Sequence, residues 1–183
     1  SYEATINVGW ELDVWGRIRR ASEASRAQLL AAEEARRTVI LTLVSSVATS
    51  YVSLRRLDRQ LEISIQTRDL RGESLRLFEL QFNGGVIGQL QLSQIQSEYE
   101  LAVSAVPLIE RDIAILENLI SALLGRNPGT IPRGKSIDQL TLAQVPEGVP
   151  SDLLLRRPDI RQAEQDLISN NALIGVARPY FQV

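Results

Sequence analysis

The chain has 183 residues, a formal net charge of −2 and few aromatic residues. The near-zero charge gives no support for a nucleic-acid partner. The absence of His and Cys removes the usual transition-metal ligands, the cysteine nucleophile and any disulfide. Met is absent even at position 1, so we expect a piece of a larger protein. No apolar run approaches the roughly 18 to 20 residues of a membrane-spanning helix, so none is expected.

Residues 1–14 alternate strictly between apolar and polar side chains, which is typical of a strand with two unlike faces. One interpretation is an edge strand of a soluble sheet, with one face buried. The other is a strand of a transmembrane barrel, because about 3.3 Å per residue gives roughly 45 Å, enough to cross a bilayer. Trp10 and Trp15 would then lie at the membrane interface. Alternation alone favours the soluble strand. The apolar face holds Tyr2, Ala4, Ile6, Val8, Trp10, Leu12 and Val14.

A long helix is predicted from about Trp15 to Asn83, because residues 16–83 contain no proline and one interior glycine, Gly72. At 1.5 Å per residue it is a rod of roughly 100 Å. Its first part carries alanines spaced 3, 4 and 4, which would let a neighbouring helix approach closely; they are Ala24, Ala27, Ala31 and Ala35. From Ile40 a looser heptad pattern takes over, and further apolar residues flank it, so this helix needs neighbours on more than one side.

Three glycines in five residues, preceded by Asn83, predict that the helix stops and reverses at residues 84–88. The candidate site comprises Asn83, Gly84, Gly85, Val86, Ile87 and Gly88. The glycines would expose backbone, and the two β-branched residues would offer apolar contact to a partner. The alternative is a tight helix reversal with no partner.

The returning helix is predicted from Gln89 to Leu124, with a kink but no break at Pro107 and a terminating Gly125. Its apolar steps alternate between 4 and 3 for four heptads, which is typical of a coiled-coil seam. The predicted structure is therefore a long antiparallel helical hairpin, residues 15–124. The seam comprises Ile95, Tyr99, Ala102, Val106, Ile109, Ile113, Leu116, Ile120 and Leu123.

Prolines and glycines make residues 125–150 a linker. It could contain a short extended segment packed on the helices, formed by Ile137, Leu140, Leu142 and Val145. A further helix is predicted over 151–178, with Ser151 as N-cap and Pro158 in a continuing first turn. Residues 179–183 are interpreted as the start of another strand. The two shorter helices, about 54 Å and about 40 Å, together match the first, so they could stack end to end along it.

Four strings resemble the outer-membrane efflux proteins, the TolC-like channels, and especially their NodT subgroup of lipoproteins. They are Trp10-Glu11-Leu12-Asp13-Val14-Trp15-Gly16-Arg17, Phe82-Asn83-Gly84-Gly85-Val86 followed by Leu90, Leu92 and Gln94, Ala122-Leu123-Leu124-Gly125, and Ser151-Asp152-Leu153-Leu154-Leu155-Arg156-Arg157-Pro158-Asp159-Ile160-Arg161-Gln162-Ala163-Glu164. Their order and spacing match across nearly the whole chain. The last string is the most specific.

The resemblance implies a mainly helical homotrimer in the Gram-negative outer membrane that extends into the periplasm. Residues 1–14 would be a barrel strand, 15–124 a periplasmic hairpin with its tip at 84–88, 125–150 an equatorial linker, 151–178 a second stacked helix and 179–183 the next strand. Pro179 and Gln182 depart from the family pattern at the entry into that last strand. The subgroup's acylated cysteine would lie upstream.

The implied function is a passive exit duct for drugs or other small toxic compounds. An inner-membrane pump would drive it, through a periplasmic adaptor that meets the tip. No enzyme and no cofactor are expected, because the chain has no His, Cys or glycine-rich phosphate loop. The alternative is a soluble structural coiled-coil hairpin, or the periplasmic adaptor itself.

Overall fold

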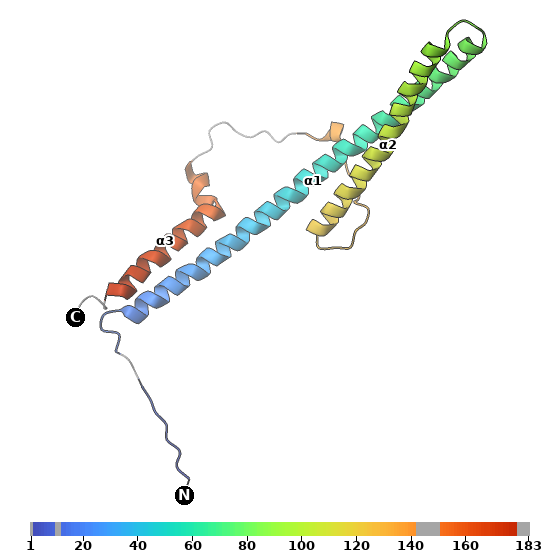
Figure 1. The fold of residues 1–183 in the computed structure, drawn as a ribbon. Coiled ribbons are helices and arrows are strands. Elements are labelled where there is room, and N and C mark those ends of the chain that lie inside the picture. Colours follow the sequence, from blue (N-terminus) through green and yellow to red (C-terminus); the bar gives the residue numbers. More distant parts are fainter. Residues whose placement is uncertain (1, 10–11, 142–150, 179–183) are drawn as a thin grey trace. The chain divides into compact units, whose positions relative to one another are not determined.

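The computed structural model describes residues 2–9, 12–141 and 151–178, the last range without the side chains of 151–153 (Figure 1). Its elements are α1 (Arg17–Asn83), α2 (Gln89–Leu123), the 3₁₀ turns η1 (Ile137–Gln139) and η2 (Ser151–Arg156), and α3 (Pro158–Ala177). The chain forms two compact units, and α1 runs through both. The first unit is Ser1–Thr42 with Val145–Val183, and the second is Leu43–Gln144.

In the first unit, α3 packs antiparallel against the beginning of α1. Arg20 contacts Gly175, and Arg161 lies 3.1 Å from Glu34. A step of 14 residues forward in α1, from 20 to 34, thus matches a step of 14 backward in α3, from 175 to 161. The predicted close contact of the α1 alanines with a neighbouring helix is present, and small side chains from both helices form the interface. Its buried members are Ala24, Ala27, Ala31, Ser169 and Ala172.

The helix predicted to begin at Ser151 is divided in the structure. Residues Ser151–Arg156 form the 3₁₀ turn η2, Arg157 is extended at φ −71° and ψ 124°, and α3 begins with Pro158 as its first residue. The physical reason is steric, because the proline ring disfavours the α conformation in the residue before it. Pro158 therefore starts a helix instead of continuing one.

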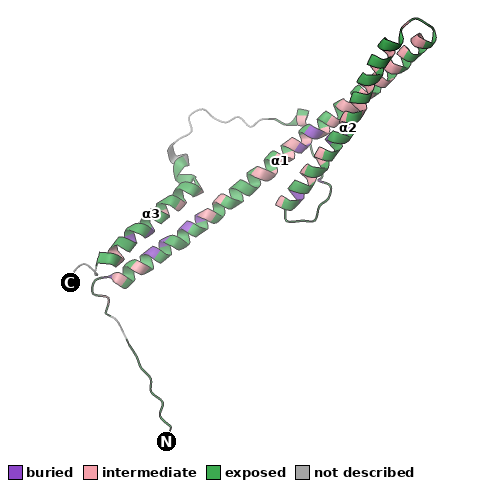
Figure 2. Ribbon diagram, in the orientation of Figure 1, coloured by how far each residue is buried: buried purple, intermediate pink, exposed green. Residues whose placement is uncertain are grey.

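Residues 2–9 and 12–14 form no strand in the structure and are largely exposed (Figure 2). A strand needs a hydrogen-bonded neighbour, and no other strand occurs among the described residues to provide one. The barrel-strand interpretation thus stays a prediction. Trp10 and residues 179–183 lie outside the described residues.

In the second unit, α2 turns back along the later part of α1 (Figure 1). A Cβ at Gly72 would lie 3.2 Å from the Tyr99 ring, so these two residues face each other, and the midpoint between them falls at Gly85 and Val86. All nine predicted seam residues of α2 are buried or half-buried. Pro107 lies inside an unbroken α2, as predicted.

The best-packed part of this unit is the base of the hairpin, where Leu54, Ile120 and Ile131 form a buried cluster. Ile131 comes from the loop that follows α2. Residues 125–140, which we call the strap, fold back against both helices. At Ile137 the predicted extended segment is instead the 3₁₀ turn η1, closed by a capping box between Ser136 and Gln139. Leu142 and Val145, its other predicted members, lie outside the described residues.

Two features of α1 correct the sequence predictions. Ile40 and Val44 are exposed, so the seam begins later than predicted. In addition, α1 contains an 18-residue window whose mean hydropathy is 1.3, and 6% of that window is buried. The expectation that no apolar run approaches a membrane-spanning length is therefore wrong, since residues 38–54 carry no charge. Among the described residues α1 is the one helix long and apolar enough for this.

Candidate functional site

The tip of the hairpin is built by a helix-terminating motif centred on Gly85. The amide of Gly85 donates to the carbonyl of Phe82 at 2.9 Å, and the amide of Val86 donates to the carbonyl of Gln81 at 2.8 Å. This pair of bonds is the Schellman arrangement, which needs a left-handed residue at its centre. Gly85 has φ +72°, so it fills that position. Leu124–Arg126 end α2 in the same way, with φ +65° at Gly125 as predicted.

The three tip glycines have different roles, although the sequence suggested one role for all. Only Gly85 has positive φ. Gly88 is the N-cap of α2 at φ −87° and ψ 162°, and nothing lies within 4 Å of a Cβ added there. A Cβ at Gly84 would make ordinary contacts of 3.5 Å or more. Backbone geometry thus requires glycine only at Gly85.

The tip presents apolar side chains to solvent. Val86 is 75% exposed, as is Leu90 at the start of α2, and Leu80 is 62% exposed. Ile87 is half-buried, while Asn83, Gly84, Gly85 and Gly88 are exposed. A Schellman motif usually packs its second outer residue, here Val86, on the preceding helix. The exposure of Val86 leaves that apolar surface free for other contacts.

The charge pattern around the tip was not noted from the sequence. Residues 80–97 carry no charged side chain, and glutamines are frequent among them. The nearest charges on either side are Glu79 and Glu98. A partner would therefore meet apolar groups, amides and open backbone, and ion pairs would contribute little. Counting charges along the sequence could have found this feature.

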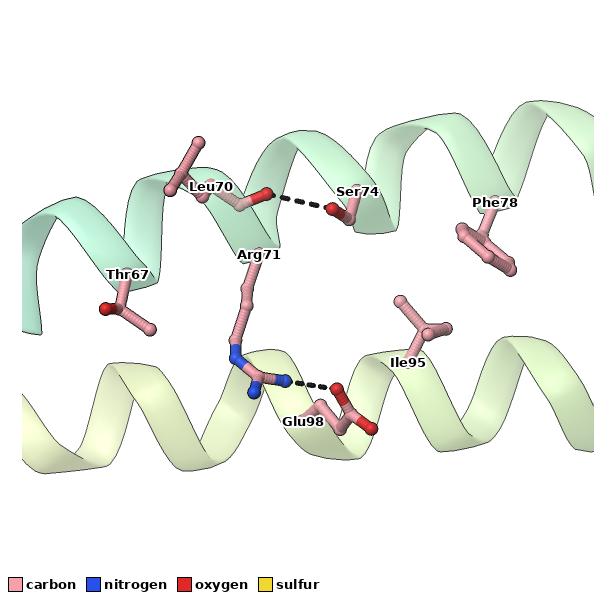
Figure 3. A pocket seen from close by; sticks show the side chains of 7 residues that line it. All are labelled: Thr67, Leu70, Arg71, Ser74, Phe78, Ile95 and Glu98. Atoms are coloured by element: carbon pink, nitrogen blue, oxygen red, sulfur yellow. Dashed lines mark hydrogen bonds and ion pairs between the residues drawn. The ribbon is translucent and has the colours of Figure 1, made fainter.

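A shallow groove lies between α1 and α2 behind the tip (Figure 3). Arg71 reaches from α1 to pair with Glu98 of α2, and Ile95 and Phe78 lie on one side of that pair (Figure 3). The pair connects the two helices and fixes their position along each other. The residues that line the groove are Thr67, Leu70, Arg71, Ser74, Phe78, Ile95 and Glu98.

At the other end of α1, Asp13 caps the helix. Its two carboxylate oxygens accept from the amides of Ile18, at 3.1 Å, and Arg19, at 3.0 Å. Gly16, at φ +75°, turns the chain so that Asp13 can reach. The bond from Arg19 is the largest cause that lowers the pKa of Asp13, and the bond from Ile18 adds to it. The sequence analysis missed this cap.

Trp15, the second predicted interface residue, is 69% exposed at this turn. It lines a hollow with Arg20 and Arg178 within the first unit. The structure thus places one predicted interface tryptophan at the surface. Among the described residues no group of three His, Cys, Asp or Glu side chains is arranged to hold a metal ion.

Comparison with known proteins gives consistent matches. Residues 1–126 match the family described as outer membrane efflux protein. The chain is 37% identical over 181 residues to the solvent efflux pump outer membrane protein SrpC of Pseudomonas putida, covering 98% of this chain and 38% of that protein. It is 35% identical over 182 residues to the cation efflux system protein CusC of Escherichia coli K12, covering 98% of this chain and 40% of that protein.

Comparison with solved structures gives matches of the same kind. A crystal structure of CusC superposes with a TM-score of 0.85 at 37% identity, covering 93% of this chain and 40% of that one. The outer-membrane channel OprN gives a TM-score of 0.84 at 31% identity, covering 92% and 38%. The chain spans about two fifths of the length of these relatives.

These neighbours confirm the predicted mainly helical, TolC-like fold, and they are outer-membrane channels of Gram-negative bacteria, not enzymes. The NodT subgroup stays a prediction. With more than half of its residues matched, the chain belongs to the outer membrane efflux protein family.

Proposed function

We propose that the protein to which this chain belongs is the outer-membrane channel of a tripartite efflux pump. It is a homotrimer that acts as a passive exit duct for small toxic compounds. An inner-membrane transporter supplies the energy, and a periplasmic adaptor connects the two. The observation that carries this proposal is the family match over residues 1–126, which includes the complete hairpin and its tip.

The tip, Asn83 to Gly88, is the proposed adaptor-docking surface. Its support is the combination of exposed Val86, open backbone at Gly88 and a run of 18 residues, 80–97, without charge. Exposed apolar groups gathered at one place are typical of contact surfaces, which supports this proposal. The backbone conformation at residue 88 would accept any residue, so it does not explain the glycine there. A partner that approaches the backbone closely would explain it.

Changing Val86 to Glu tests the docking surface. A buried unpaired charge would be costly at an apolar contact, so efflux should be lost while trimers still reach the outer membrane. The matched control is Val86→Thr, which keeps the shape and adds no charge. Drug susceptibility and outer-membrane trimer content are measured together. Normal resistance in Val86→Glu, with normal trimer content, would remove the tip as a docking surface and leave the family assignment intact.

Residues 1–14 are proposed to be a barrel strand, with Trp10 and Trp15 at the membrane interface. The exposure of Trp15 and the exposed apolar side chains of Ile6 and Val8 support this. In lipid vesicles, brominated acyl chains should quench the fluorescence of both tryptophans, and single Trp→Phe variants separate the two signals. A soluble coiled-coil hairpin or a periplasmic adaptor would show no quenching and would need no detergent.

A further inference from the structure

The base of the hairpin is closed by one arginine of the strap. The Arg133 guanidinium donates to both carboxylate oxygens of Asp58 on α1, at 2.9 and 3.1 Å. The same side chain donates to Glu117 on α2, at 2.5 Å. Arg133 therefore joins α1, α2 and the strap in one network. A forked pair of this kind fixes orientation as well as distance, which a single point charge does not.

Backbone groups of the strap complete the attachment. The amide of Ile131 donates to Glu117 at 3.1 Å, and the amide of Gly134 donates to the Tyr51 hydroxyl at 2.8 Å. Arg55 donates to the carbonyl of Lys135 at 2.9 Å. Four side chains of the hairpin, counting Asp58, thus hold the strap over a stretch of five residues.

The strap is attached mainly by partly exposed polar groups and by one buried apolar side chain. Ile131 is the one buried residue of the strap, at 7% exposure. The Arg133 side chain is 31% exposed, and Asp58 and Glu117 are 23% and 14% exposed. The seam between α1 and α2 continues from here to the tip without the strap. The strap therefore depends on the hairpin, while most of the hairpin contacts do not involve the strap.

We propose that the strap is a latch that opens on its own, with α1 and α2 still packed, and that Arg133 is the positioning residue that keeps it closed. Regions with few buried apolar contacts open locally at a lower free energy than the core they rest on. Opening would uncover Leu54 and Ile120, the apolar floor beneath Ile131. The proposal does not depend on efflux activity.

Hydrogen exchange on the protein in detergent micelles tests the latch. In Arg133→Gln, amides of residues 126–135 should exchange about tenfold faster or more, because charge-assisted hydrogen bonds are lost. Arg133→Lys keeps the charge but not the fork, so it should fall between wild type and Arg133→Gln. Peptides from the middle of α2, around Val106 and Ile109, should keep their wild-type rates.

The matched control is Arg71→Gln, which removes an arginine of α1 that pairs with Glu98 of α2. It makes the same chemical change far along the hairpin, so it should leave exchange in the strap unchanged. Three results would overturn the latch. Strap exchange could be unchanged in Arg133→Gln, strap and α2 peptides could accelerate together, or Arg71→Gln could accelerate the strap equally. The last two would show a single cooperative unit.

Discussion

Single residues at the two ends of α1 determine where this helix starts and stops. Asp13 satisfies two amides that the first turn leaves without an intrahelical partner, and Gly85 supplies the left-handed conformation at the other end. Gly85 is exposed and Asp13 is half-buried, and both roles rest on backbone hydrogen bonds or backbone conformation. Substitutions there report on backbone chemistry directly.

Gly85 and Gly88 form a matched pair for a test of backbone strain. Ala at residue 85 would be forced into φ +72°, which costs roughly 1–2 kcal/mol. Ala at residue 88 adopts φ −87° freely and meets open space, so its effect on stability should stay within about 0.5 kcal/mol. Urea unfolding of both variants checks this. Equal destabilisation would show that the tip glycines are not distinct.

Asp13 predicts a pH dependence with a defined sign. Its folded pKa lies below the ordinary value of 3.8, so its stabilisation of α1 is present above that value and is lost as pH falls through the lowered pKa. Protection of the Ile18 and Arg19 amides, relative to their intrinsic exchange rate at each pH, should therefore fall only in acid. In Asp13→Ala this protection should already be low at neutral pH, with little further change in acid. A strong remaining acid dependence in that variant would assign the effect to another group.

The helices show how far a sequence pattern reaches. The α2 seam, the alanine contact of α1 and the Schellman glycines follow from periodicity and from local backbone chemistry, so they could be predicted. The strap could not, because Arg133 and Asp58 are 75 residues apart and an ion pair leaves no periodic trace. Arg157 is a third case, because its position before Pro158 already disfavours the α conformation and so marks the helix start. The glycine cluster predicts the exposed tip, and the absence of charge over residues 80–97 is equally visible in the sequence.

The contact between α1 and α3 should tolerate little added volume. Ala27 is 3% exposed opposite α3, so Ala27→Leu would overpack the interface at a cost of roughly 1–3 kcal/mol. Ala32 is exposed on the same helix, and Ala32→Leu is the matched control. Thermal unfolding and hydrogen exchange in α3 measure the difference. Equal effects of the two variants would mean that α3 does not pack on Ala27 and its neighbouring buried alanines.

Across the chain as a whole, charge is distributed unevenly. Ion pairs are frequent on α1, yet residues 38–54 and 80–97 carry none of the charged residues. These two uncharged runs coincide with exposed apolar side chains, which include Val39, Val44 and Val86. Such a pattern suits surfaces that meet other protein, because bare apolar area is costly in water.

The uncharged tip predicts how docking responds to salt. If the adaptor meets residues 83–88, its affinity should change less than about threefold between 50 and 500 mM salt, because no charge of this chain is there to be screened. Binding of detergent-solubilised channel to immobilised adaptor measures this. A steep loss of affinity with salt would place the contact outside the tip, near the arginines and glutamates farther along the hairpin.

The pairing of Gly72 with Tyr99 has an evolutionary corollary. The turn at Gly85 connects α1 to α2 at the tip, and Arg133 bonds to carboxylates of both helices at the base. A seven-residue insertion in α1 or α2 alone would shift the pairing of the two helices by one heptad between the insertion and the base. Arg133 could then no longer reach Asp58 and Glu117 together. Longer or shorter members of this lineage should therefore differ by repeats gained or lost in both rods together.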